Sequence, residues 1–227
     1  GKTALVHSRL SIIGGAQGRQ PMSDSSGRYT LVFNGEIFNY KALASKYQLP
    51  PDSDTRLLVE LWAKKQHEAI RLLRGQYSFA VHDNSSNTTT LVRDEFGVLP
   101  LFVAFPRGEM AFSSSARCLA VLLDSLPFES NDDLSGWLRN RFVPDGRTLW
   151  RGVFEFPKGH VITFKHGQEI AKVNTSSTLS PVSGVNNLRG LLVKRSKEIV
   201  VADCEVGFLF SGGLDSSIAA KFCSRQL

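Results

Sequence analysis

A short run of glycines, hydroxyls and one acid near the end of the chain has the residue types that bind a phosphate group. The run is SGGLDSS, residues 211–217, and it follows the apolar stretch Val206–Phe210. A strand, a glycine turn and a helix start together present backbone N–H groups to an anion. The acid and hydroxyls suit pyrophosphate with a divalent cation, and the absence of lysine between Val206 and Ala220 excludes a Walker A loop. The structural alternative is a tight strand-to-helix turn with Asp215 or Ser216 as its N-cap.

Three other polar groups are candidates for chemistry, but each has an ordinary structural explanation when taken alone. Arg9 is typical of a surface ion pair. Asn34–Gly35 lies between two strand-like runs, where Asn-Gly favours a type I′ hairpin turn. Asp54 follows Ser53 at a predicted helix start, where the helix dipole favours an acid. On local pattern alone, these structural interpretations are preferred.

The elements that must position these residues are mostly strands joined by short turns. Runs rich in β-branched and aromatic residues predict strands, and the spacing of Leu57, Leu58, Leu61 and Trp62 predicts an amphipathic helix that ends before Gly75. Short turns between strands indicate antiparallel sheets, so the fold class is α+β. The predicted strands are 3–6, 29–33, 77–82, 88–93, 100–105, 110–113, 150–153 and 159–164, and further helices are predicted at 41–47, 116–123, 132–140 and 187–200.

Composition excludes several classes of protein. The chain has 227 residues, 42% of them hydrophobic, which is enough for a full core, and no run approaches a membrane span. Its three cysteines are odd in number and scattered, which favours a reducing cytoplasmic location over a disulfide framework. The net charge of +6 comes from dispersed basic residues, which indicates a solvated surface and no nucleic-acid partner.

A stretch rich in Ser, Thr, Pro and Gly divides the chain. We predict a first domain at 1–174 that lacks its N-terminal start, a linker at 175–184, and a second domain of which residues 185–227 are only the beginning. Whether the protein forms a homodimer is left open.

The motifs, taken in order, resemble glutamine-hydrolysing asparagine synthetases, in which a class II glutamine amidotransferase domain precedes a PP-loop ATP pyrophosphatase domain. The resemblance covers nearly the whole chain. It implies an Ntn-hydrolase-type αββα sandwich of antiparallel sheets, followed by the first strand, loop and helix of an α/β domain. The motifs are HSRLSI (7–12), QPM (20–22), FNGEIFN (33–39), Ser53–Asp54, LRGQYSFA (73–80), RDEFGVLPL (93–101), RFVPDGRTLWRGV (141–153), PKGH (157–160) and SGGLDSS (211–217).

By this resemblance, the first domain would bind glutamine. Arg9 would hold its α-carboxylate, which needs a bidentate donor, and the backbone of Leu10, Ile12 and Ile13 would line the same pocket. Glu36 and Asp54 would hold the α-ammonium. The Asn34 side chain and the Gly35 N–H would form the oxyanion hole for a tetrahedral intermediate.

The resemblance likewise implies a site for ATP and Mg²⁺ in the second domain. Asp215 would also hold the metal, whose hard character suits a carboxylate oxygen. Ammonia from the first site would then attack an acyl-adenylate, formed from aspartate in the family. The residues expected to bind ATP are Phe210, Ser211, Gly212, Gly213, Asp215, Ser216 and Ser217.

The chain departs from the family pattern in ways that keep two alternatives open. The family's nucleophile is a cysteine at the mature N-terminus, and none of Cys118, Cys204 or Cys223 can replace it. The segment between Asn39 and Asp54 is also shorter than is usual in the family. One alternative is an amide- or lactam-forming ligase, of the β-lactam synthetase or lasso cyclase type, with an inactive glutaminase domain. The other is a non-catalytic regulatory or scaffold protein on the same fold.

Overall fold

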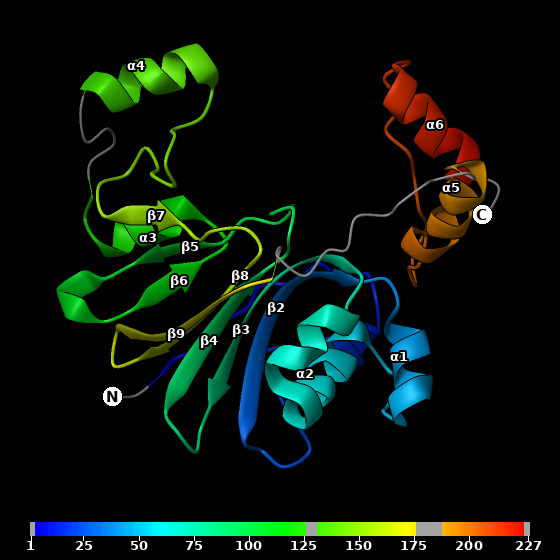
Figure 1. Ribbon diagram of the computed structural model, residues 1–227, viewed down its shortest axis with the longest axis horizontal. Coiled ribbons are helices and arrows are strands. Elements are labelled where there is room, and N and C mark those ends of the chain that lie inside the picture. The colour runs from blue at the N-terminus through cyan, green and yellow to red at the C-terminus, as the bar shows by residue number, and fades with distance from the viewer. Residues whose placement is uncertain (1–2, 126–130, 176–187, 225–227) are drawn as a thin grey trace.

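The largest element of the computed structural model is a six-stranded antiparallel sheet, seen in the lower half of Figure 1. The structure describes residues 3–125, 131–175 and 188–224. The strand order is β1-β2-β3-β4-β8-β9. The strands are β1 (Met22–Ser23), β2 (Tyr29–Ile37), β3 (Gly75–Asp83), β4 (Thr88–Arg93), β8 (His160–Lys165) and β9 (Gln168–Asn174).

A second, three-stranded antiparallel sheet lies on one face of the first. Its order is β6-β5-β7, with β5 (Phe102–Ala104) between β6 (Ala111–Ser113) and β7 (Val153–Glu155). In Figure 1 it lies at upper left, above the large sheet. The strand predicted at 150–153 begins later than expected, because residues 150–152 form a turn whose Trp150 carbonyl accepts a hydrogen bond from the Val153 N–H at 3.2 Å.

The alternation of side chains along the large sheet divides its residues between two cores. On β2 and β3, Phe33 and Phe79 belong to the core under the helices α1 (Tyr40–Tyr47) and α2 (Asp54–Lys65). On the opposite face, Val32 and Ala80 belong to the core shared with the second sheet. A third cluster packs α3 (Ala116–Leu122) against β5 and β7. The order of layers is therefore helix, sheet, sheet, helix, which confirms the predicted αββα sandwich.

Helix α2 begins where the sequence predicts it. The Ser53 side chain accepts a hydrogen bond from the Arg56 N–H at 3.0 Å, which satisfies one of the free donors of the first turn. Leu57, Leu58 and Leu61 are fully buried against the sheet. The 3₁₀ helix η2 (Gln66–Leu72) follows and leads directly into β3.

Three helices and two short 3₁₀ turns lie outside the sandwich in the described part of the chain. Helix α4 (Asn131–Asn140) lies on the far side of the second sheet, and α5 (Leu188–Ile199) packs with α6 (Leu214–Cys223). The 3₁₀ turns are η1 (Gly15–Gly18) and η3 (Pro106–Gly108). Apart from Thr175, the linker predicted at 175–184 lies outside the described residues, so the domain boundaries stay a prediction.

Two predicted strands are absent from the described residues, and two described strands, β1 and β9, were not predicted. Residues 3–6 pair with no strand, although Leu5 packs against the core between the sheets. Residues 206–210 also pair with no strand, and Leu209 is fully exposed. In both places no described strand lies alongside to complete a ladder, and strand residues need that partner. The unpredicted strands form the two edges of the large sheet: β1 has only two residues, and every residue of β9 is exposed.

Candidate active site

All eight residues that were predicted to bind glutamine line one pocket of about 310 Å³. We call it the Arg9 pocket. It lies where the segment of residues 7–13 passes β2 and the start of α2. The pocket is also lined by seven residues for which no binding role was predicted, namely His7, Ser8, Gln20, Phe33, Thr55, Gln76 and Leu99.

Arg9 is fixed by the loop that follows it in the chain. Its Nη1 donates to the carbonyl of Gly15 at 2.7 Å and to the Ser11 hydroxyl at 3.3 Å, and its Nη2 donates to the carbonyl of Ile13. A guanidinium carries five N–H donors, so two are left by these three contacts. Two donors are enough to bind both oxygens of one carboxylate.

Two carboxyl groups, Glu36 and Asp54, line the same pocket. Burial raises the pKa of Glu36. Burial also raises the pKa of Asp54 to about 6; the hydrogen bonds from the Ile37 and Thr55 N–H groups oppose this rise, and the neighbouring Glu36 adds to it. Among the described residues, no ion pair joins Arg9 to either acid. One pocket therefore holds a cation and two acids that form no ion pair with each other, although the charge of Arg9 acts to lower the pKa of Asp54.

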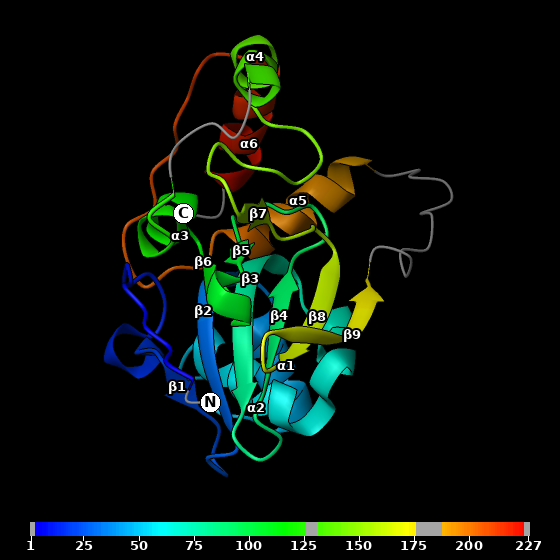
Figure 2. The same cartoon turned by 90° about the vertical axis from the view of Figure 1, so that its left-hand side faces the viewer.

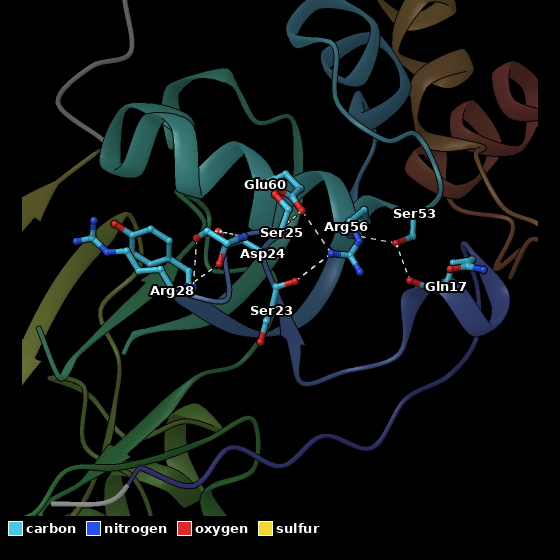
Figure 3. Close-up of polar contacts among 10 residues, drawn as sticks. Gln17, Ser23, Asp24, Ser25, Arg28, Ser53, Arg56 and Glu60 are labelled. Atoms are coloured by element: carbon cyan, nitrogen blue, oxygen red, sulfur yellow. Dashed lines mark hydrogen bonds and ion pairs between the residues drawn. The ribbon is translucent and has the colours of Figure 1, made fainter. Parts of the chain in front are cut away.

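The position of Asp54 is set by a polar network at the start of α2, drawn in Figure 3. Ser53 Oγ donates to the Gln17 carbonyl at 3.4 Å, which ties the helix to η1. Two turns later, Glu60 accepts hydrogen bonds from the Ser25 N–H and hydroxyl, both at 2.9 Å, and pairs with Arg56 at 3.4 Å. The first two turns of α2 are thus tied to η1 and to the segment between β1 and β2, which fixes the direction of the Asp54 side chain.

Asn34 and Gly35 lie within β2, so the hairpin turn favoured by the local pattern is wrong. The strand runs from Tyr29 to Ile37 and pairs with β3 along its whole length. A methyl group at Gly35 would lie 2.2 Å from the Gln76 carbonyl oxygen, and its φ is +147°. The close approach of β3 and this backbone conformation both require glycine.

The backbone of β2 presents an N–H to the pocket at Gly35. The N–H of Phe33 bonds to the Gln20 side chain and that of Ile37 bonds to Asp54, so both point away from β3. Because the N–H direction alternates along a strand, the Gly35 N–H points the same way, toward the pocket. Strand β1 pairs only with residues 30 and 31 of β2, so it does not cover this edge.

Gln20 is a pocket residue whose structural role was not predicted. Its side-chain amide accepts from the Phe33 N–H at 2.5 Å and donates to the Phe33 carbonyl at 3.0 Å and to the Thr55 hydroxyl at 3.4 Å. It therefore replaces a neighbouring strand at the edge of β2 and links β2 to the start of α2. The partners lie 13 and 35 residues along the chain, so no local pattern could reveal them.

The residues predicted to bind ATP gather at the start of α6. Gly213 is the N-cap residue, Asp215 lies in the first turn, and the hydroxyls of Ser216 and Ser217 donate to the Gly213 carbonyl at 3.1 and 2.7 Å. Ser211 Oγ lies 3.0 Å from Ser216 Oγ. Hydroxyls, a helix N-terminus and one acid are a donor set that fits a phosphate and its cation. Phe210 precedes them and is exposed.

The three cysteines of the described residues lie away from the Arg9 pocket. Cys118 and Cys204 are exposed and Cys223 is buried, and none of them lines this pocket. No group of three or more His, Cys, Asp or Glu side chains in the described part is arranged to hold a metal ion. None of the described helices has the length and apolar content needed to cross a membrane.

The solved structures that resemble this fold include two enzymes. A structure titled as the allosteric regulatory enzyme of purine biosynthesis superposes with a TM-score of 0.53 at 16% identity, covering 76% of this chain and 35% of its own. Glutamine phosphoribosylpyrophosphate amidotransferase from B. subtilis superposes with a TM-score of 0.50 at 15% identity, covering 90% and 47%. At these sequence identities, the similarity to the two structures shows the fold alone.

Comparison of sequences gives relatives that are named as asparagine synthetases. A putative glutamine-hydrolysing asparagine synthetase of Mycobacterium tuberculosis is 30% identical over 250 residues, which cover 100% of this chain and 38% of the relative. Asparagine synthetase 1 of Bacillus subtilis is 30% identical over 92% of this chain and 35% of its own length. Asparagine synthetase B of Escherichia coli is 27% identical over 98% and 38%. The chain thus spans somewhat more than a third of the length of these relatives.

The family comparison matches the part of the chain that forms the αββα sandwich. Residues 1–174 match the family described as "Glutamine amidotransferase domain". These residues include every residue that lines the Arg9 pocket. The chain therefore belongs to the glutamine amidotransferase domain family.

Proposed function

We propose that the Arg9 pocket binds L-glutamine and hydrolyses its side-chain amide, within an ATP-dependent ligase that uses the ammonia to convert aspartate to asparagine. The observation that carries the proposal is the charge arrangement of one small pocket. A guanidinium with two N–H donors to spare and two carboxyl groups line it without pairing with each other. An α-amino acid carries the complementary carboxylate and ammonium.

The remaining pocket groups suit the reacting end of glutamine. Attack of a thiolate on the amide carbon gives a tetrahedral oxyanion, which the Asn34 side chain and the Gly35 N–H would stabilise by hydrogen bonds. Collapse of that intermediate releases ammonia and leaves a thioester, which water hydrolyses to glutamate. None of the three cysteines lines the pocket, so the proposal assigns the nucleophile to a cysteine outside residues 1–227.

The second half of the proposal concerns the start of α6. Ser211, Gly212, Gly213, Ser216 and Ser217 would bind the phosphates of ATP, Phe210 would approach the nucleotide through its backbone, and Asp215 would hold Mg²⁺. When bound, Mg²⁺ and ATP supply the activation of the acceptor carboxyl as an adenylate. The support is the donor set at the helix start together with the names of the relatives.

Binding and turnover test the two halves separately. Calorimetry should detect binding of L-glutamine by the protein, and this binding should be sharply weakened in Arg9→Ala but kept in the control Arg19→Ala, whose side chain is exposed and outside the pocket. In the full-length protein, glutamate release should require the nucleophile. Pyrophosphate release with ATP, Mg²⁺ and aspartate should be lost in Asp215→Ala while glutamine hydrolysis persists.

The outcomes also separate the alternatives. Glutamine binding without glutamate release in the full-length protein would favour a related ligase with an inactive glutaminase domain. Absence of both glutamine binding and ATP-dependent pyrophosphate release would favour a regulatory or scaffold role.

A further inference from the structure

The segment that follows α5 returns to the Arg9 pocket and bonds to its loop. Asp203 makes two contacts there: its Oδ2 accepts from the Gly14 N–H at 2.6 Å, and its own N–H donates to the Ile12 carbonyl at 2.9 Å. Figure 2 shows this orange segment beside the blue loop that follows Arg9. The two residues are 189 positions apart in the chain. We call this pair of hydrogen bonds the Asp203 clasp.

The clasp brackets the residue that holds the Arg9 guanidinium. Ile13 lies between the two clasped residues, and its carbonyl accepts from Arg9 Nη2. Gly15, the next residue after the clasped Gly14, gives the second carbonyl, which accepts from Nη1 at 2.7 Å. The clasp therefore acts on the backbone that sets the direction of the two donors left free on Arg9.

The loop that contains Gly14 and Gly18 is closely packed on the sides that face α2 and Arg9. Gly14 has a φ of +76°, and a methyl group there would lie 2.4 Å from Ser53 Cβ. A methyl group at Gly18 would lie 2.3 Å from Arg9 Nη2. The loop is thus packed between the start of α2 and the guanidinium. The Asp203 clasp closes the remaining side, where the Asp203 carboxylate accepts a hydrogen bond from the Gly14 N–H.

The Asp203 segment is itself attached to the sandwich. Val201 packs against the core under α1 and α2. Glu198, at the end of α5, pairs with Arg74 at 3.4 Å on the surface. The exposed ion pair contributes little, so the apolar contact of Val201 is the main attachment. Asp203 therefore reaches the loop from a fixed backbone.

We propose that Asp203 is a positioning residue of the Arg9 pocket, which orders residues 12–15 and thereby aims Arg9 at the α-carboxylate of the ligand. The proposal rests on the proposed function for the identity of that ligand, L-glutamine. A carboxylate that accepts a backbone N–H forms a charge-assisted hydrogen bond, which is stronger than a neutral one. Loss of this bond frees Gly14 and lets the carbonyls of residues 13 and 15 move, and Arg9 with them.

The test compares variants at Asp203 with a matched control. Asp203→Ala should weaken glutamine binding by about tenfold in calorimetry, the equivalent of one such hydrogen bond. Asp203→Asn keeps an acceptor oxygen and should restore most of the affinity. Glu205→Ala, an exposed acid two residues along the same segment, should change nothing. The thermal midpoint should move little in all three variants, because both side chains are exposed.

A thermodynamic cycle with Arg9 separates positioning from a general loss of structure. In an Arg9→Ala background, Asp203→Ala should cause no further loss of affinity, because the group through which it acts is gone. The residual binding needed for this comparison is measured with glutamine in excess. Additive losses would overturn the proposal, as would an affinity for Asp203→Ala equal to that of the wild type.

Hydrogen exchange distinguishes failure of this proposal from failure of the proposed function. The amides of residues 12–15 should exchange faster in Asp203→Ala than in the wild type, whether or not a ligand binds. If the wild type binds no glutamine, the proposed function fails, and unchanged exchange would then refute the positioning role as well. Faster exchange confined to these residues would support it.

Discussion

Replacing Asp54 by asparagine should stabilise the unliganded protein at neutral pH and remove its affinity for glutamine. The side chain is only 3% exposed, and burial raises its pKa from 3.8 to about 6. The folded state thus binds the proton more tightly than the unfolded chain does. The stability that Asp54 contributes is therefore fully present below about pH 4 and is lost as the pH rises through 6. Above that pH, the neutral amide avoids the cost of a buried charge.

The structure gives the expected size of the effect. The difference between 3.8 and about 6 corresponds to about 3 kcal/mol. The carboxylate also accepts hydrogen bonds from the Ile37 and Thr55 N–H groups, at 3.3 and 2.8 Å. One amide oxygen replaces two acceptors, which costs about 1 kcal/mol. The expected gain is therefore about 2 kcal/mol at pH 7.5, or several degrees in the thermal midpoint. At pH 4.5, where the wild-type carboxyl is already protonated in the folded state, the gain should fall by about 2 kcal/mol.

Urea unfolding of the wild type and Asp54→Asn at the two pH values measures this change. The control is Asp52→Asn, which removes an exposed acid two residues earlier and should show no such pH dependence. Calorimetry with glutamine at pH 7.5 should show binding by the wild type and the control only. A stability difference that is the same at both pH values would refute the raised pKa. Unchanged glutamine affinity would refute the role of Asp54 as a partner of the ammonium.

Three further substitutions test the backbone and the cation of the pocket. Gly35→Ala should destabilise the protein by several kcal/mol, because the added methyl group would lie 2.2 Å from the Gln76 carbonyl oxygen. The control is Gly27→Ala, where φ is +73° but no atom lies within 4 Å of the added methyl group, so the loss of stability should be about 1 kcal/mol. Equal losses of stability in thermal unfolding would contradict this prediction. Gln20→Met should lower the thermal midpoint and weaken glutamine binding, since the N–H and the carbonyl of Phe33 lose their hydrogen bonds to the Gln20 amide. An unchanged glutamine affinity in calorimetry would show that the Gln20 amide does not affect binding in the pocket. Arg9→Lys keeps the charge but not the planar pair of donors, so glutamine affinity should fall at least tenfold, and a smaller loss would argue against bidentate binding.

The sheets were predictable where one face of a strand is buried and its neighbours are close in the chain. Residues 88–93 have a β-branched run bounded by turn residues, and β4 has these same limits. Strand β9 escaped prediction because it lies at the sheet edge with all its side chains exposed, so no alternation of polar and apolar residues marks it. The apolar run 206–210 predicts a buried strand, but a strand also needs a partner that this run lacks among the described residues.

The members of the candidate site were predictable from family resemblance and not from local pattern. Asn34–Gly35 has the local signature of a turn, yet the pairing of β2 with β3 continues through it, because Gly35 accepts the close approach of the neighbouring strand. The contacts that hold the pocket in shape could be predicted neither from local pattern nor from family resemblance. Gln20 and Asp203 act on backbone groups that are distant in sequence, and a side chain bonded to a distant backbone leaves no periodic signal.

The Asp203 clasp also limits the distance between the two proposed sites. Seven residues, 204–210, separate Asp203 from Ser211. A fully extended chain of that length spans about 30 Å at most. Whatever the arrangement of the rest of a longer protein, a group at Ser211 stays within about that distance of Gly14 while the clasp is closed. A small molecule released at the Arg9 pocket would therefore have to diffuse only about 30 Å to reach the loop of residues 211–217.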